Sequence, residues 1–466
     1  MLGKYLKFLK TGQDAGTESR ASDSESDLSV VPDSPKSFSS RSVSCREDVP
    51  GQDQSSVAGE KWQLFLGRQP ILDASGQFIG YELKLQDRNF LSDVGDNESL
   101  RQVQDELLVV SVIDLDFQKA LGSRLVFIQV SPGMLDNPII ESLPKQKVVV
   151  GIRLTEASND LLLQRCSELV ALGIPLALED FECRPEYVPF LAICSWVKLN
   201  TARYDALALS QQISAILGAG KPRLIAQNVE SDDAFEAYRA LAFDFFQGAY
   251  FSRLRPDAPQ RLDNDRMRVM EMLNLVMNHA ELSVLEDKVK RDPGLSFKLL
   301  SYINSPANGL QQTIRSIGHG LTLLGYDQLY RWLTLLLFTS GTMDARSRTL
   351  FKNALVRARF TETLGQSRFE PAERGGLFIV GIFSLLDAML NVPMAQVVSR
   401  LNLPDPVVEA LQHRTGIYAP YLKLAIACEN FDQDAIARYA AACELAAEEV
   451  NVTHVKALIW GEEVDG

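Results

Sequence analysis

The sequence contains few of the residues that build disulfide frameworks and soft metal sites. Among its 466 residues are six cysteines and four histidines, and no two cysteines have the C-x-x-C spacing. The histidines are far apart, and none is followed by an aspartate: they are His279, His319, His413 and His454. We therefore expect neither a disulfide framework nor a zinc site, and no metal site built on histidine.

Long apolar runs and an excess of positive charge are also missing. The longest apolar run, LFIVGIFSLL at residues 377–386, is about half the length that a bilayer span needs. The N-terminus lacks the apolar core and cleavage site of a signal peptide. Because 60 Asp and Glu outnumber 47 Lys and Arg, the net charge is -13, and such a surface repels phosphate backbones. These features predict a soluble cytoplasmic protein without general nucleic-acid binding.

The N-terminal residues 1–60 are rich in Ser, Asp, Glu and Gly instead. From residue 11 onward they hold too few apolar residues to form a core, so we predict a disordered tail. The first ten residues, MLGKYLKFLK, differ because Leu2, Leu6 and Leu9 share one helical face beside lysines. A basic amphipathic peptide docks on a membrane surface or a partner groove. Ten residues alone form a marginal helix, however, so a frayed tail is the simpler interpretation.

Residues 61–256 alternate short apolar runs with helix-length segments. The runs expected to be strands are FLGRQPIL, FIGYELKL, RLVFIQV, KVVVGIRL, PLALEDF, SWVKLN, RLIAQNV and DFFQGAYF. Strand–helix alternation is typical of parallel strands with crossover helices, and this pattern predicts a compact TIM-type (β/α) barrel. Chemistry in that fold lies where strands end. The polar residues that fall there are Glu82, Arg153, Asp180, Lys198 and Gln227.

Residues 257–466 have a different pattern. The polar segment LRPDAPQRLDNDR at 254–266 holds two prolines and marks the expected domain boundary. After it, apolar residues recur at spacings of three and four, as in RMRVMEMLNLVMNHA and RTLFKNALVRARFTETLGQ. This spacing predicts an all-helical domain.

Together these segments resemble a known pair of domains. GRQPILDASGQFIGYELKLQ, LALEDF, VKLN, LIAQNVES and DFFQGAYFSRL follow the order of the EAL domain of cyclic di-GMP phosphodiesterases. LEDKVKRDPGLSFKLLSYINS, IRSIGHGLTLLGYDQLYRWL and LFIVGIFSLLDAML resemble the HDOD domain, a relative of HD phosphohydrolases that lacks their metal site. The resemblance covers nearly everything after residue 61 and implies a bacterial EAL–HDOD signalling protein.

The resemblance also implies where a phosphodiesterase site would lie. The family holds two divalent ions with oxygen ligands from several strand ends. Glu82 and Lys198 match the family's glutamate and catalytic lysine, whereas Gln129, Arg153 and Gln227 stand where it has metal ligands. The full set of matching positions is Glu82, Gln129, Arg153, Glu179, Asp180, Lys198, Gln227 and Glu230.

Arg153 is the most damaging of these departures. Its guanidinium stays charged and repels a divalent ion that a glutamate would attract. We therefore expect a degenerate site without metal or other cofactor, in which Glu82, Arg153, Asp180 and Lys198 form an ion-pair cluster. In the helical half, Ser384 and Leu385 stand where an HD enzyme has its His-Asp pair.

These expectations favour a protein that is not an enzyme. The leading hypothesis is a signalling adaptor that works through protein contacts, with a role in motility, surface attachment or biofilm that the resemblance alone implies. The first alternative is a receptor that binds cyclic di-GMP without cutting it, and the second is a slow phosphodiesterase. A protein partner is expected, but the sequence does not identify it, and the sequence leaves the oligomeric state open, a homodimer included.

Overall fold

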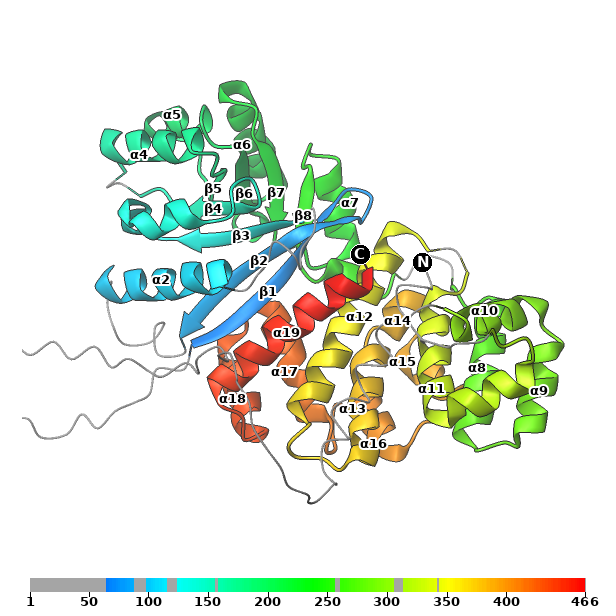
Figure 1. Cartoon of the computed structure of the whole chain (residues 1–466). Helices are drawn as coiled ribbons and strands as arrows, with labels where there is room; N and C mark the ends of the chain where they lie inside the picture. The colour runs from blue at the N-terminus through cyan, green and yellow to red at the C-terminus, as the bar shows by residue number, and fades with distance from the viewer. Residues whose placement is uncertain are drawn as a thin grey trace, which may run out of the picture.

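The computed structural model describes residues 64–87, 98–114, 124–155, 158–255, 260–305, 313–341 and 343–465. They form a β-barrel with helices around it, followed by an all-helical region (Figure 1). This confirms the predicted fold class. The predicted domain boundaries, after residues 60 and 256, and the predicted N-terminal tail lie outside the described residues and stay predictions.

Eight strands close the barrel in chain order. Each overlaps one of the eight predicted apolar runs, because alternate residues of such a run face the barrel interior and the surrounding helices. The strands are β1 Leu64–Asp73, β2 Phe78–Asp87, β3 Leu125–Val130, β4 Val148–Ile152, β5 Leu176–Leu178, β6 Trp196–Asn200, β7 Arg223–Gln227 and β8 Phe245–Gln247.

The first strand runs against the others. β1 pairs antiparallel with β2 and with β8, whereas β2 to β8 are parallel. The prediction of parallel strands is therefore wrong for β1. The reason is the turn between β1 and β2, in which the Asp73 carboxylate accepts from the backbone N–H of Ser75 and Gln77, and Gly76 has a φ of 80°. A turn of this length makes a hairpin and leaves no room for a crossover helix.

Helices and short 3-10 turns connect the parallel strands. N-cap side chains fix where three of the helices begin: Asn159, Asp205 and Ser231 each accept from backbone N–H groups of the first turn. The helices are α2 Glu98–Asp114, α4 Asp160–Ala171, α5 Val188–Leu191, α6 Ala206–Ala219 and α7 Asp232–Arg239. The 3-10 turns are η2 Pro132–Asp136, η3 Pro138–Ser142, η4 Pro185–Tyr187, η5 Thr201–Arg203 and η6 Tyr250–Ser252.

The region after the barrel contains helices throughout its described part. They are α8 Asn264–Met277, α9 Leu282–Lys290, α10 Pro293–Ile303, α11 Ile317–Thr339, α12 Ala345–Leu364, α13 Pro371–Phe383, α14 Leu386–Leu390, α15 Met394–Val398, α16 Asp405–Val408, the π-helical turn η8 Glu409–His413, α17 Ala419–Asn430, α18 Gln433–Ala442 and α19 Ala447–Asp465. The longest, α11, is kinked at Gly325, whose φ is 67°.

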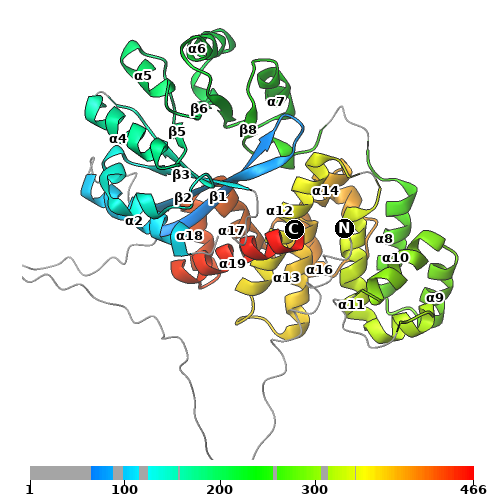
Figure 2. The ribbon, with the colours of Figure 1, turned by 45° about the horizontal axis from the view of Figure 1, so that its top comes forward.

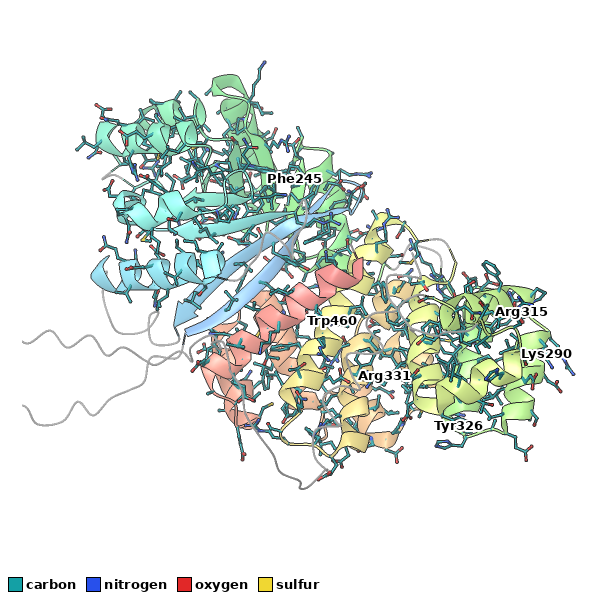
Figure 3. All side chains as sticks on the ribbon, in the orientation of Figure 1. Phe245, Lys290, Arg315, Tyr326, Arg331 and Trp460 are labelled. Carbon is teal, nitrogen blue, oxygen red and sulfur yellow. The ribbon has the colours of Figure 1, made fainter. Side chains whose placement is uncertain are left out.

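The two parts pack together along β1. Helices α17, α18 and α19 lie against this strand, and both ribbon views show them beneath it (Figures 1 and 2). Backbone groups of Leu66 take part, because its N–H donates to Asn451 over 2.8 Å and its carbonyl lies 3.1 Å from Nδ1 of His454. One apolar core runs from the outside of the barrel into the helical region. The far end of that region, with Lys290 and Tyr326, is remote from Phe245 in the barrel (Figure 3).

Candidate functional site

The barrel interior is apolar at one end and polar at the other. Its lower layer is a buried cluster in which the rings of Phe127 and Trp196 meet edge to face at 5.1 Å. The other buried members of the cluster are Ile71, Val149, Ala177 and Ile225. This layer fills the barrel, so the polar residues above it face only the carboxyl ends of the parallel strands. Active sites of TIM barrels lie at that end.

A cavity of about 460 Å³ opens above the apolar layer. It is lined by Gln69, Glu82, Lys84, Gln129, Arg153, Glu179, Asp180, Asn200, Gln227, Asn228, Glu230, Gln247, Ala249, Arg253, Asn430 and Phe431. A larger hollow, about 700 Å³, lies at the opposite end of the barrel beside Trp196 and Arg223. That hollow has no Asp, Glu or His in its lining. The smaller polar cavity is therefore the candidate site.

A fully buried lysine lies at the base of the cavity between two carboxylates. Nζ of Lys198 is 3.0 Å from Oε1 of Glu82 and 2.7 Å from Oε1 of Glu179. All three side chains are almost completely inaccessible to solvent. Burial lowers the pKa of Lys198, but the two carboxylates outweigh burial and raise it, so the lysine is charged at neutral pH. The lysine thereby offsets the cost of burying negative charge.

The two carboxylates differ because other groups reach only one of them. Nζ of Lys84 is 3.3 Å from Oε1 of Glu82, and the Gln247 amide donates to Oε2 of the same carboxylate. Burial alone raises the pKa of Glu82, but Lys198, Lys84 and Gln247 together lower it to about 2. For Glu179, burial outweighs Lys198, and the pKa is raised. Glu82 is thus the more firmly ionised of the pair.

A second ion pair lies nearer the rim. The Arg153 guanidinium donates to Oδ2 of Asp180, and Nη1 of Arg203 lies 3.8 Å from the same oxygen. The Arg153 side chain is 53% exposed, whereas that of Asp180 is 12% exposed. On the other side of the cavity, Glu230 pairs with Arg253 over 2.8 Å. Two arginines with exposed side chains, Arg153 and Arg253, therefore line the rim, and Arg203 lies beside it near Asp180.

The structure brings the eight sequence-derived positions to one end of the barrel. Seven of them line the cavity, and Lys198 lies directly beneath it. The predicted cluster of Glu82, Arg153, Asp180 and Lys198 is divided, however. Lys198 pairs with Glu82 and Glu179, while Arg153 pairs with Asp180.

Sequence reasoning missed several members of the site. Lys84 follows Glu82 by two residues, so strand alternation places both on the interior face. The sequence could therefore have predicted that Lys84 belongs to the site. Gln247 ends β8, where a polar side chain again marks the carboxyl end of a strand. Asn430 and Phe431 come from the helical region, and no pattern in the sequence places them beside the barrel.

The side chains present do not fit the two divalent ions that the resemblance implies. Both oxygens of Glu82 are engaged by Lys198, Lys84 and Gln247, and Asp180 is engaged by two arginines. Within the described ranges, no group of three or more His, Cys, Asp or Glu residues is placed to hold a metal ion. Hard cations need several free oxygen ligands that converge, and here these ligands are already bound by cations of the protein.

The helical half contains a buried charged network next to the barrel. Arg357 donates to Glu429 through Nε over 2.9 Å and through Nη2 over 2.7 Å, and its Nη1 donates to Ser384 over 2.9 Å. Arg68 of β1 joins this network through Nη2, which is 3.4 Å from Glu429. Ser384, at the position of the missing His-Asp pair, is therefore a hydrogen-bond partner of Arg357.

Comparison with known proteins identifies part of the helical half. The HDOD domain matches residues 264–387. The helical half contains an HDOD domain. Over a longer stretch, the chain is 27% identical to "Cyclic di-GMP phosphodiesterase CdgJ" of Vibrio cholerae across 408 residues, which cover 87% of this chain and 94% of that protein. It is 25% identical to "Uncharacterized protein YuxH" of Bacillus subtilis across 409 residues, which cover 85% of this chain and 98% of that protein.

Among solved structures, several EAL proteins align with part of the chain. "PaMucR Phosphodiesterase, c-di-GMP complex" matches with a TM-score of 0.35 and 18% identity, covering 42% of this chain and 98% of that chain. A standalone EAL protein from Vibrio cholerae O395 matches with a TM-score of 0.34 and 20% identity, covering 42% of this chain and 93% of that chain. The HDOD match and the relatives that span both parts confirm the EAL–HDOD resemblance.

One prediction has to be corrected. The sequence was interpreted as that of a protein that is not an enzyme, because three ligand positions are altered. The Vibrio relative, which matches over most of the chain, is named a phosphodiesterase, and this contradicts that interpretation. The error was to infer the absence of activity from individual substitutions.

No helix in the described part of the chain is long and apolar enough to cross a membrane.

Proposed function

We propose that this chain is a cyclic di-GMP signalling protein that takes up cyclic di-GMP in the strand-end cavity. The observation that carries the proposal is the cavity itself, a polar hollow of about 460 Å³ at the end of the barrel where TIM barrels bind substrates. The name of the Vibrio relative supports the choice of ligand. In this proposal the HDOD region relays the state of the cavity to protein partners.

The charges of the cavity suit an anionic ligand at the rim. Arg153, Arg203 and Arg253 have side chains that are 51–57% exposed; the first two share the Asp180 carboxylate, and Arg253 pairs with Glu230. A guanidinium binds phosphate oxygens through two parallel hydrogen bonds. We expect the phosphodiesters to lie at the rim among these arginines, with the bases deeper or to the side, where Asn200, Gln227 and Asn228 offer amide donors and acceptors.

A binding measurement tests this function. The full chain is titrated calorimetrically with cyclic di-GMP at 0.15 M salt, alongside a cavity-filling variant, Gln129→Trp, and a control variant, Gln164→Trp. Gln129 lines the cavity, whereas Gln164 is exposed on α4. We expect saturable binding that the first variant removes and the second leaves unchanged. No binding at 1 mM ligand, or equal binding by both variants, would contradict the proposal.

A second candidate function is cyclic di-GMP phosphodiesterase activity, the activity in the name of the Vibrio relative. The observation that favours it is the retained Lys198, held between Glu82 and Glu179 at the base of the cavity. Hydrolysis adds one water to one phosphodiester and yields a linear dinucleotide. The test is product formation by the full chain with Mg²⁺ or Mn²⁺, compared with Lys198→Met. Activity that survives Lys198→Met would remove this lysine from the reaction.

Other features stay proposals. We propose that the output concerns motility, surface attachment or biofilm, and that partners bind the HDOD surface. The comparison of the full chain with its two halves in a deletion strain tests this assignment. A homodimer is one open alternative for the oligomeric state. Membrane contact by residues 1–10 stays the less favoured alternative to a frayed tail, and those ten residues lie outside the described part.

A further inference from the structure

One wall of the cavity comes from outside the barrel. Asn430, the last residue of α17, and Phe431, which follows it, line the cavity together with residues of the barrel strands. Helix α17 belongs to the helical region and packs on β1 (Figure 2). The cavity is therefore built by both parts of the chain.

The position of the Phe431 ring is fixed by its backbone conformation and by its contact with β1. Phe431 follows the last residue of α17 and has the left-handed conformation, with a φ of 56°. Its ring lies against Gly67 of β1, where an added Cβ would be 2.3 Å from Cδ1 of Phe431. Only a glycine at position 67 lets the ring approach the strand this closely.

Phe431 also contacts Lys84, a charged residue of the cavity lining. Nζ of Lys84 lies 5.0 Å from the centroid of the Phe431 ring, within the range of a cation–π contact. The same Nζ is 3.3 Å from Oε1 of Glu82. A continuous path of contacts thus runs from Glu82 through Lys84 to the helical region.

Glu429, the residue before Asn430 and Phe431, is held by side chains of both α12 and β1. Glu429 accepts hydrogen bonds from Arg357 of α12, and Nη2 of Arg68 on β1 is 3.4 Å from its Oε1. All three side chains are buried. A shift of β1 relative to α12 therefore moves Glu429, and with it Asn430 and Phe431 at the edge of the cavity.

We propose that Asn430 and Phe431 are ligand-contacting residues and that the Lys84–Phe431 contact couples occupancy of the cavity to the helical region. The ligand in this proposal, cyclic di-GMP, rests on the proposed function. Asn430 is exposed, and its amide offers a donor and an acceptor to a base or a phosphate. Phe431 transmits the effect because its ring helps to hold the Lys84 ammonium beside the cavity, where the negative charge of a bound ligand stabilises the same position of the lysine. Linkage then requires the helical region to influence affinity in return.

The first experiment measures affinity in the full chain. The variants are Asn430→Ala, Phe431→Ala and Gly67→Ala, and the control is Phe297→Ala, a 73% exposed aromatic on α10. We expect each of the first three to weaken cyclic di-GMP binding at least fivefold, and the control to stay within twofold. Gly67→Ala does not add a side chain to the cavity lining, so its effect arises through displacement of Phe431. If Asn430→Ala and Phe431→Ala bind like the control, the proposal is wrong.

The second experiment needs no ligand and separates this inference from the proposed function. Hydrogen exchange of residues 419–431 is compared for the unmodified chain, Lys84→Met, Phe431→Leu and the double variant. We expect Lys84→Met to speed exchange at the end of α17 in the unmodified background and to have no such effect once Phe431 is replaced. If the unmodified chain binds no cyclic di-GMP, the proposed function fails and this cycle alone decides the coupling. Additive effects of the two substitutions would overturn the proposed coupling between Lys84 and Phe431.

Discussion

The guanidinium of Arg68, on the first strand of the barrel, donates from Nε to Nε2 of His454, on the last helix, over 2.9 Å. The two residues are 386 positions apart in the sequence. Nδ1 of the same imidazole donates to the carbonyl of Leu66, so the ring is neutral with its proton on Nδ1. The pair joins the barrel to the helical region through buried polar groups, which are satisfied only when both parts are in place.

Replacement of Arg68 by methionine tests this junction. The variant keeps most of the side-chain volume but removes the donors to His454 and Asn353 and the cation beside Glu429. We expect the free energy of unfolding to fall by about 3 kcal/mol, since a buried ion pair loses one partner. Urea denaturation measures the change. Arg239→Met is the control: its pair with Glu236 is half exposed, and a loss within about 0.5 kcal/mol is expected.

The neutral state of His454 predicts a dependence of stability on pH. Burial, and then the nearby Arg68, lowers the pKa of His454 to about 3, whereas in the unfolded chain it is about 6.5. The unfolded state therefore binds the proton first as pH falls. The stabilisation is complete above pH 6.5 and decreases as the pH falls toward 3, on the order of 1.4 kcal/mol per pH unit.

The measurement compares the unmodified chain with His454→Gln, whose amide keeps one donor and one acceptor. Urea denaturation between pH 4.5 and pH 7 gives the stability of each. Carboxylates with lowered pKa values, such as Glu82, add a slope of the same sign to both proteins, so the difference between the two curves isolates the histidine. Parallel curves across this range would show that His454 titrates alike in the folded and unfolded states.

The sequence was sufficient to predict the barrel but not the way it is completed. Eight strands follow from eight apolar runs, and the polar residues at their ends do lie together. The antiparallel direction of β1 depends on a four-residue turn, and strand periodicity carries no information about direction. The contacts of Arg68 with Glu429 and His454 depend on how two domains pack, and residues 361 positions apart carry no local signal of that packing.

The sequence predicted which residues form the charged site better than it predicted which of them form ion pairs. Glu82 and Lys198 were expected to pair, and they do. Arg153 was expected in the same cluster, but it follows the end of β4 near the rim, where Asp180 is the carboxylate within reach. Glu179 lies beside Lys198 instead, because Gly151 on the neighbouring strand β4 leaves space for the carboxylate: an added Cβ there would lie 2.3 Å from Oε1.

The buried lysine gives a third prediction. Lys198→Met leaves Glu82 and Glu179 without their shared cation, and we expect a loss of about 3–5 kcal/mol in the free energy of unfolding. Adding Glu179→Gln should restore part of that loss, because it removes one of the two stranded carboxylates. The coupling is read from the double-mutant cycle by urea denaturation. Lys288→Met, at a pair with Glu271 that is about half exposed, serves as the control and should cost about 0.5 kcal/mol or less.

The last prediction concerns Arg153, whose replacement should affect ligand binding much more than the free energy of unfolding. Its side chain is 53% exposed, so its pair with Asp180 is screened by solvent, and Arg153→Ala should change the free energy of unfolding by about 1 kcal/mol or less. Its charge nevertheless faces the cavity, where an anionic phosphodiester would lie. Two unit charges about 4 Å apart interact by roughly 4 kcal/mol at an effective dielectric constant near 20, and salt reduces this at an open rim. We therefore expect Arg153→Ala to weaken cyclic di-GMP binding about tenfold or more and Arg153→Glu to weaken it further, each with a smaller difference at high salt.

Titration calorimetry at two salt concentrations measures the affinities, with Arg239→Ala, outside the cavity, as the control. Equal or tighter binding by Arg153→Glu would contradict the proposed attraction between Arg153 and the phosphodiester.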